Sequence, residues 1–125
     1  MLEFFLEKPT NGVANIYDSY ITFNRVIANY LEDAYRVRVA IDRENKEIHF
    51  YKLNKDQALS KEYSEQSMLK VGITKTYARV CSKQLVDFIS KAFDLTIKKK
   101  EYKQYKACYN DSKKEIIVSV KGGCL

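Results

Sequence analysis

The sequence lacks most features that mark unusual protein classes. It has no tryptophan, one proline and four glycines, and 46% of its residues are hydrophobic. This composition excludes low-complexity and disordered chains. No stretch reaches the ~18 apolar residues that a membrane-spanning helix needs. The first residues include Glu3 and Glu7 and lack the basic region of a signal peptide. We therefore expect a cytoplasmic protein without a membrane partner, folded as a single domain over residues 1–125.

Motifs for catalysis, metal binding and phosphate binding are also missing. Cys81, Cys108 and Cys124 show no C-x-x-C spacing, and we expect the first two to be free thiols in the core. His49 is the single histidine, and it is expected on the solvent side of a strand without catalytic partners. Asp42 and Glu44 are typical turn residues, and the glycines form no phosphate-binding loop. The sequence predicts no catalytic residue, no metal ligand, no cofactor and no enzyme activity.

Charge is unevenly distributed along the chain. Residues 1–53 hold seven Lys and Arg against eight Asp and Glu, whereas residues 54–125 hold fifteen against eight. A basic half favours a polyanion or an acidic protein surface as partner. A lysine-rich surface that only maintains solubility is the alternative.

Two similar stretches reveal an internal repeat. Residues 40–50, AIDRENKEIHF, resemble residues 108–118, CYNDSKKEIIV, and TFNRVIANYL at 22–31 resembles VCSKQLVDFI at 80–89. Strands are expected at 2–8, 13–17, 20–23, 36–41, 47–53, 68–73, 76–81, within 94–110 and at 115–120, and helices at 25–34 and 83–93. Asn24 and Ser82 are the expected N-caps. The repeated unit is strand–helix–β-hairpin, over about 13–53 and 71–120, with a linker at 54–66.

One such unit of ~45 residues is too small to bury a core without metals or disulfides. We therefore predict an α+β fold in which two strand–helix–β-hairpin repeats share one core. The two units are expected to be related by a pseudo-two-fold operation, in a small barrel-like sheet with two short helices.

The order ITFNRVIANYL…RVRVAIDRENKEIHFYKL resembles the swapped-hairpin unit of AbrB/SpoVT/MazE-like transcription factors. That family has a strand, a short capped helix and a hairpin with an acidic turn. The resemblance implies two interleaved units in a small barrel that binds DNA, here within one chain. The family's Gly-Arg before the strand is Ser19-Tyr20 here, and its Gly-Asp step after the helix is Ala34-Tyr35. Small bacterial and mobile-element proteins share the same two-unit layout.

The segment IKKKEYKQYKACY at 97–109 is the candidate binding surface, because lysines neutralise phosphates and tyrosines stack on unpaired bases. The candidate residues are Arg79, Lys83, Lys98, Lys99, Lys100, Tyr102, Lys103, Tyr105 and Lys106. The alternative is an edge strand on which Tyr105, Ala107 and Tyr109 point inward and lysines prevent pairing with other sheets.

The sequence thus predicts a small non-enzymatic binding protein, with a nucleic-acid-binding regulator of swapped-hairpin type as the leading interpretation. The alternative is a protein–protein inhibitor or adaptor, such as an antitoxin-like or phage-encoded factor. A nucleic acid, an acidic protein and a second copy of the chain all stay open as partners.

Overall fold

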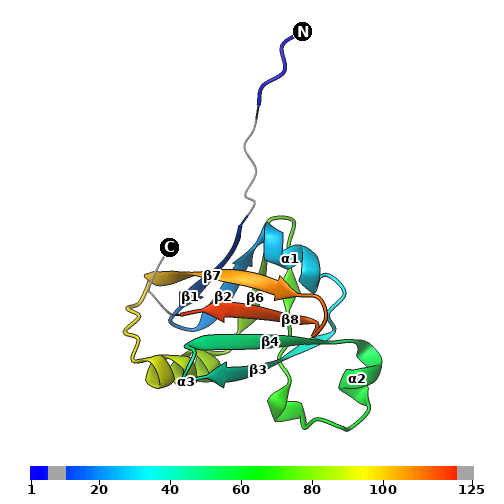
Figure 1. Ribbon diagram of the computed structural model, residues 1–125, viewed down its shortest axis with the longest axis vertical. Helices are drawn as coiled ribbons and strands as arrows, with labels where there is room; N and C mark the ends of the chain where they lie inside the picture. Colours follow the sequence, from blue (N-terminus) through cyan, green and yellow to red (C-terminus); the bar gives the residue numbers. More distant parts are fainter. Residues whose placement is uncertain (6–10, 121–125) are drawn as a thin grey trace.

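The computed structural model describes residues 1–5 and 11–120 of the chain. Their fold is α+β, as predicted, with one antiparallel eight-stranded sheet and short helices (Figure 1). The strands are β1 (Gly12–Tyr17), β2 (Tyr20–Asn24), β3 (Arg36–Asp42), β4 (Glu47–Leu53), β5 (Gly72–Ile73), β6 (Tyr77–Cys81), β7 (Tyr102–Asn110) and β8 (Glu115–Ser119). The helices are α1 (Arg25–Leu31), α2 (Lys55–Leu59), α3 (Lys83–Phe93) and a 3₁₀ turn, η1 (Glu65–Ser67).

The sheet curls into a half-barrel. Its strand order is β3-β4-β8-β7-β1-β2-β6-β5, so β3 and β5 are the two edges. Val37 of β3 and Leu69, three residues before β5, exchange backbone hydrogen bonds of 2.9 and 2.8 Å. These bonds bring one edge of the sheet close to the other, and the curvature leaves a concave inner face and a convex outer face.

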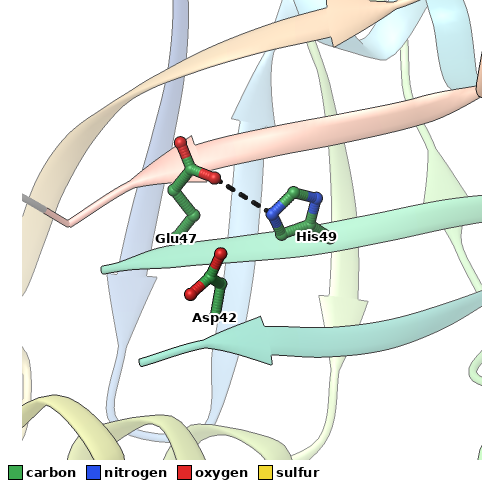
Figure 2. A group of neighbouring side chains, drawn as sticks. All are labelled: Asp42, Glu47 and His49. Atoms are coloured by element: carbon green, nitrogen blue, oxygen red, sulfur yellow. Dashed lines mark hydrogen bonds and ion pairs between the residues drawn. The ribbon is translucent and has the colours of Figure 1, made fainter. Parts of the chain in front are cut away.

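The β3–β4 hairpin forms where the alternating sequence predicts it. Asp42 ends β3 and Glu47 begins β4 (Figure 2). The Asp42 carboxylate accepts hydrogen bonds from the backbone N–H and the side-chain amide of Asn45, at 3.1 and 2.8 Å. Lys46 closes the turn with a φ of 54°, in the left-handed region. An acidic first residue therefore stabilises this turn locally.

The β7–β8 hairpin has a closely similar turn. Asn110 takes the place of the aspartate, and its side-chain oxygen accepts from the backbone N–H of Ser112 at 3.2 Å. Lys114 closes the turn with a φ of 54°. β7 pairs with β1 on one side and β8 on the other. The edge-strand interpretation of this segment is therefore wrong, whereas the strand predicted within 94–110 is present as Tyr102–Asn110.

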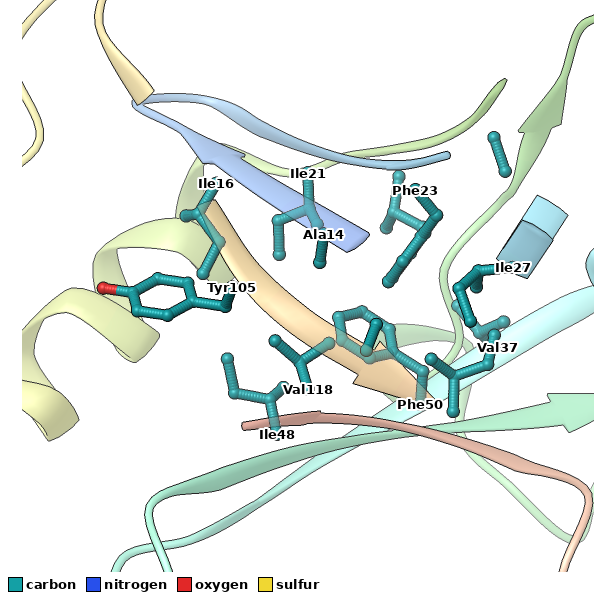
Figure 3. Close-up of a cluster of buried hydrophobic side chains, with 14 of the residues drawn as sticks. Ala14, Ile16, Ile21, Phe23, Ile27, Val37, Ile48, Phe50, Tyr105 and Val118 are labelled. Carbon is teal, nitrogen blue, oxygen red and sulfur yellow. The ribbon is translucent and has the colours of Figure 1, made fainter. Parts of the chain in front are cut away.

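The hydrophobic core fills the concave side of the sheet (Figure 3). Phe23 of β2 and Phe50 of β4 meet edge to face, with ring centroids 5.0 Å apart. Such aromatic pairs add stability beyond the area they bury. Gly12 is required where β1 crosses α1, since a Cβ there would lie 2.3 Å from the carbonyl oxygen of Ala107 and 2.5 Å from Ile27 Cδ1.

The two longer helices bury one face each in this core. Ile27, Ala28 and Leu31 of α1 are buried, as are Val86 and Ile89 of α3. The side chain of Ser82 caps α3 by accepting from the Leu85 N–H, as predicted. Asn24 occupies the N-cap position of α1, but its side chain accepts from the Val13 N–H of the neighbouring strand instead. The helix ends at Leu31, three residues before the predicted end.

Two predicted segments differ in the structure. Residues 1–5 form no strand and are exposed, so the strand expected at 2–8 is wrong for its described part. The predicted linker, 54–66, contains α2, where Asn54 and Gln57 form a reciprocal capping box. This local hydrogen bonding makes a short helix from a polar segment without apolar periodicity. The predicted tail at 121–125, with Cys124, lies outside the described residues.

Candidate nucleic-acid interface

The outer face of the sheet gathers aromatic and cationic side chains from strands distant in sequence. Successive residues of a strand point to opposite faces. On β7, Tyr105 and Ala107 point into the core, which places Tyr102, Gln104 and Lys106 on the outer face. The strand register then aligns these residues with outward residues of β1, β2 and β6.

Three tyrosines form a row across this face, which we call the tyrosine row: Tyr102 of β7, Tyr17 of β1 and Tyr20 of β2. Tyr102 pairs with Tyr17 across the strands, with ring centroids 5.1 Å apart. Tyr17 and Tyr20 are stacked at 4.4 Å with an interplanar angle of 13°. The row has an open end, because Tyr102 is 52% exposed.

The other end of the tyrosine row carries a positive charge. The Arg79 guanidinium lies 4.8 Å from the ring centroid of Tyr20, a cation–π contact. Its Nε donates to the sulfur of Cys81 at 2.9 Å, and this contact is the main cause that raises the pKa of Arg79. The pKa of Tyr17 is also raised, first by burial and then by the neighbouring phenols Tyr20 and Tyr102. The tyrosine row therefore ends beside a permanent cation.

A polar row runs beside the tyrosines on the same face. Gln104 of β7 donates from Nε2 to Asn15 Oδ1 of β1 at 3.0 Å. Asn15 pairs with Thr22 of β2, which in turn pairs with Arg79 of β6. Lys106 follows one row further along and is exposed. The face thus combines flat rings, amide groups and two cations, the kinds of group that bind bases and phosphates.

Seven of the nine predicted site residues are exposed, and they fall into three groups. Arg79, Tyr102 and Lys106 share the outer face. The exposed lysines of the loop between α3 and β7, Lys98, Lys99 and Lys100, precede Tyr102 in the chain. Lys83 is exposed at the start of α3, and its Nζ lies 3.7 Å from Oδ1 of Asp87.

Tyr105 was wrongly included among the binding residues. Its side chain is 2% exposed and packs in the core, where it has no access to a base. Lys103 has the same strand parity as Tyr105 and is only partly exposed, at the start of β7. The edge-strand alternative correctly assigned Tyr105 and Ala107 to the inner face, although the strand itself is central.

The prediction of buried cysteines is also wrong, because Cys81 and Cys108 are both exposed. The sequence alignment placed them over Phe23 and Ala40, presumed core positions. Ala40 is itself exposed, and Cys81 follows the buried Val80 in its strand. A shift of one residue in a strand moves every side chain to the other face. Both thiols belong to the outer face.

A second cation-rich surface lies away from the tyrosine row. A cavity of about 460 Å³ is lined in part by Arg38, Lys52, Lys113 and Lys114. Three of these cations already have partners. Arg38 lies 4.1 Å from the ring centroid of Tyr63, Lys52 is 2.9 Å from Asp33, and Lys114 is 3.6 Å from Asp111. The tyrosine row, with its open end, is the better-equipped surface for a base.

Comparisons with known proteins give no relative: no family model, no curated protein and no solved structure matches the chain. In the described part of the chain, the helices are too short or too polar to cross a membrane.

Proposed function

We propose that the protein is a non-enzymatic, single-stranded nucleic-acid-binding regulator that uses the outer face of β7, β1, β2 and β6. The tyrosine row carries this proposal. Tyr17 lies between two rings and Tyr20 is covered by Arg79, so Tyr102 offers the accessible ring. A base stacked on Tyr102 extends a stack that already exists. Because every base has a flat face, such binding tolerates many sequences.

Cations around the row supply the phosphate contacts in this proposal. Arg79 and Lys106 share the face, and the exposed Lys98, Lys99 and Lys100 lead into Tyr102. A single-stranded nucleic acid with one base stacked on Tyr102 is expected to run its phosphate backbone along these side chains. The expected signature is moderate affinity with strong salt dependence.

We further propose that the fold consists of two strand–helix–hairpin units of swapped-hairpin type within one chain. Three observations support this proposal. Both hairpin turns close with a lysine at φ 54°, Lys46 and Lys114. Both begin with a side chain, Asp42 or Asn110, that accepts a turn N–H. The strand order brings β4 beside β8 and β2 beside β6, the positions that a two-fold exchange of the units requires.

A protein partner is the second candidate function, and one observation favours it. Leu2, Phe4 and Phe5 are all strongly exposed at the start of the chain. Neighbouring exposed apolar side chains are typical of protein interaction sites. An inhibitor or adaptor would bind through this segment, and its affinity would depend only weakly on salt.

The nucleic-acid proposal is tested with Tyr102→Ala, measured by fluorescence anisotropy against short oligothymidylate and its RNA equivalent at low salt. Loss of one stacked base is expected to cost about 1–3 kcal/mol, roughly a 5- to 150-fold weaker affinity. Tyr30→Ala is the matched control, because Tyr30 is a similarly exposed tyrosine on α1. Equal affinity of both variants would remove the tyrosine row from the binding site, and no binding by the unmodified protein would leave the protein partner as the leading candidate.

A further inference from the structure

Three potential metal ligands meet beside the β3–β4 turn. Asp42 ends β3, and Glu47 lies directly across from it on β4. His49 follows two residues later and therefore shares the face of Glu47. One ligand atom from each of the three residues lies within 4.8 Å of the others (Figure 2). The sequence alone gave no such signal, because the three residues look like an ordinary hairpin turn and a solvent-facing histidine.

The orientation of the His49 ring is fixed from outside this group. Glu115 of β8 is 2% exposed and is the one buried charged residue in the described part of the chain. Its Oε2 lies 3.2 Å from His49 Nδ1. A buried carboxylate accepts hydrogen bonds, and a ring N–H of His49 can supply one.

That arrangement leaves an unusual set of acceptors on the other side of the ring. When Nδ1 donates to Glu115, Nε2 is the ring nitrogen left for a metal ion, and it lies 3.1 Å from Glu47 Oε1. Carboxylates only accept hydrogen bonds. In residues 1–5 and 11–120, no lysine or arginine forms an ion pair with Asp42 or Glu47. His49 Nε2 and the two carboxylates converge here, and either a ring proton or a metal ion can lie between them.

We propose that Asp42, Glu47 and His49 Nε2 bind a divalent transition-metal ion, with Glu115 as the residue that positions the histidine. A metal-bound histidine nearly always donates its other ring N–H to a carboxylate or carbonyl. Imidazole with two carboxylates suits zinc and manganese. Nitrogen and oxygen ligands lie about 2.0–2.2 Å from zinc. The three ligand atoms, which lie within 4.8 Å of one another, would therefore move closer together around an ion, and Asp42 would exchange a hydrogen bond from Asn45 for the metal. The inference is independent of nucleic-acid binding.

The test uses Mn²⁺ as the first probe, because manganese favours oxygen and nitrogen ligands and avoids the exposed thiols of Cys81 and Cys108. Electron paramagnetic resonance of the full chain should show one bound Mn²⁺, displaced by Zn²⁺. Glu47→Gln and His49→Gln should each lower the affinity at least about tenfold. Glu44→Gln, in the same turn but outside the ligand group, should leave it unchanged.

The Glu115→Gln variant distinguishes metal binding by an oriented histidine from unspecific binding by surface carboxylates. Loss of the carboxylate that orients the ring is expected to weaken metal binding by about 10- to 100-fold. Nitrogen-15 NMR of His49 supplies a readout that packing alone does not move: Zn²⁺ should shift Nε2 while Nδ1 keeps its proton. Absence of Mn²⁺ binding at millimolar concentration would overturn the proposal, as would binding that His49→Gln leaves intact.

Discussion

The β3–β4 and β7–β8 hairpins have the same backbone plan but different outer faces. Both place an isoleucine in the core at matching positions, Ile48 and Ile116, and both close their turns with a lysine at φ 54°. At the centre of the contact between them, His49 of β4 pairs with Ile117 of β8. The inner face of a hairpin is constrained by the shared core, whereas its outer face is free to differ. The first hairpin carries the acidic and histidine group, and the second carries part of the tyrosine row.

The shared inner faces predict the largest effects. Ile48→Ala and Ile116→Ala should each lower the free energy of unfolding by about 2–5 kcal/mol, through lost burial and the cavity left behind. Chemical denaturation measures both. Ile73→Ala is the control, since Ile73 is 38% exposed in the edge strand β5. The comparison is contradicted if either core variant lowers the free energy of unfolding by no more than this control does.

The outer face of β7 predicts an effect on binding rather than on stability. Lys106→Gln should lower the slope of log affinity against log salt by about one, because one phosphate contact is lost. Lys113→Gln, in the turn of the same hairpin, should leave the slope unchanged. Both variants should unfold at nearly the same temperature as the unmodified protein, because exposed charges contribute little to stability. Equal slopes for the two variants would place the phosphate path elsewhere.

The two turns predict a smaller, matched effect. Lys46→Gly and Lys114→Gly remove the steric cost of a left-handed residue but increase the freedom of the unfolded chain. We expect each to stabilise the fold by about 0.5–1 kcal/mol, measured by thermal unfolding. Gains that differ widely between the turns would show that the hairpins are less alike than their backbone angles suggest.

The loss of stability at acid pH should also differ between the two hairpins, and we expect this effect to be the smallest. A hydrogen bond from Lys52 of β4 holds the pKa of Asp33 below its ordinary value of 3.8. A lowered folded pKa stabilises the protein above about pH 4, and this contribution is lost as the pH falls through the folded value. The Asp33 side chain is 78% exposed, so the change in unfolding temperature should be slight. Lys52→Met should abolish it, and an unchanged acid profile in that variant would exclude the ion pair as its cause.

The Asp33–Lys52 pair lowers the pKa of Asp33, whereas the pKa of Lys52 is raised. Burial alone would lower the pKa of Lys52, but its bonds to Asp33 and Tyr109 outweigh burial and raise it. The stabilisation is therefore present below the ordinary lysine pKa and is lost at more alkaline pH. At the matching position the second hairpin has Val120, which has no charge to lose.

Local patterns in the sequence predict most helices and strands, but they do not predict the register in which the strands pair. The alternation at 36–53 and the cap at Ser82 gave the first hairpin and α3, because these signals depend on neighbouring residues. Tyr17 and Tyr20 were missed as site residues, since only the pairing of β1 with β7 and β2 aligns them with Tyr102. The burial of Tyr105 and the exposure of Cys81 depend on strand parity, which a low-identity internal alignment does not fix.

The most direct test of the proposed function is an NMR titration of the nitrogen-15-labelled protein with oligothymidylate at low salt. Binding at the tyrosine row predicts that the largest shifts occur at Tyr102, Tyr17 and Arg79, with smaller ones at Lys98–Lys100. The β3–β4 turn should be unaffected. Shifts confined to the cavity around Arg38 and Tyr63, or no shifts at all, would contradict binding by the outer face of β7, β1, β2 and β6.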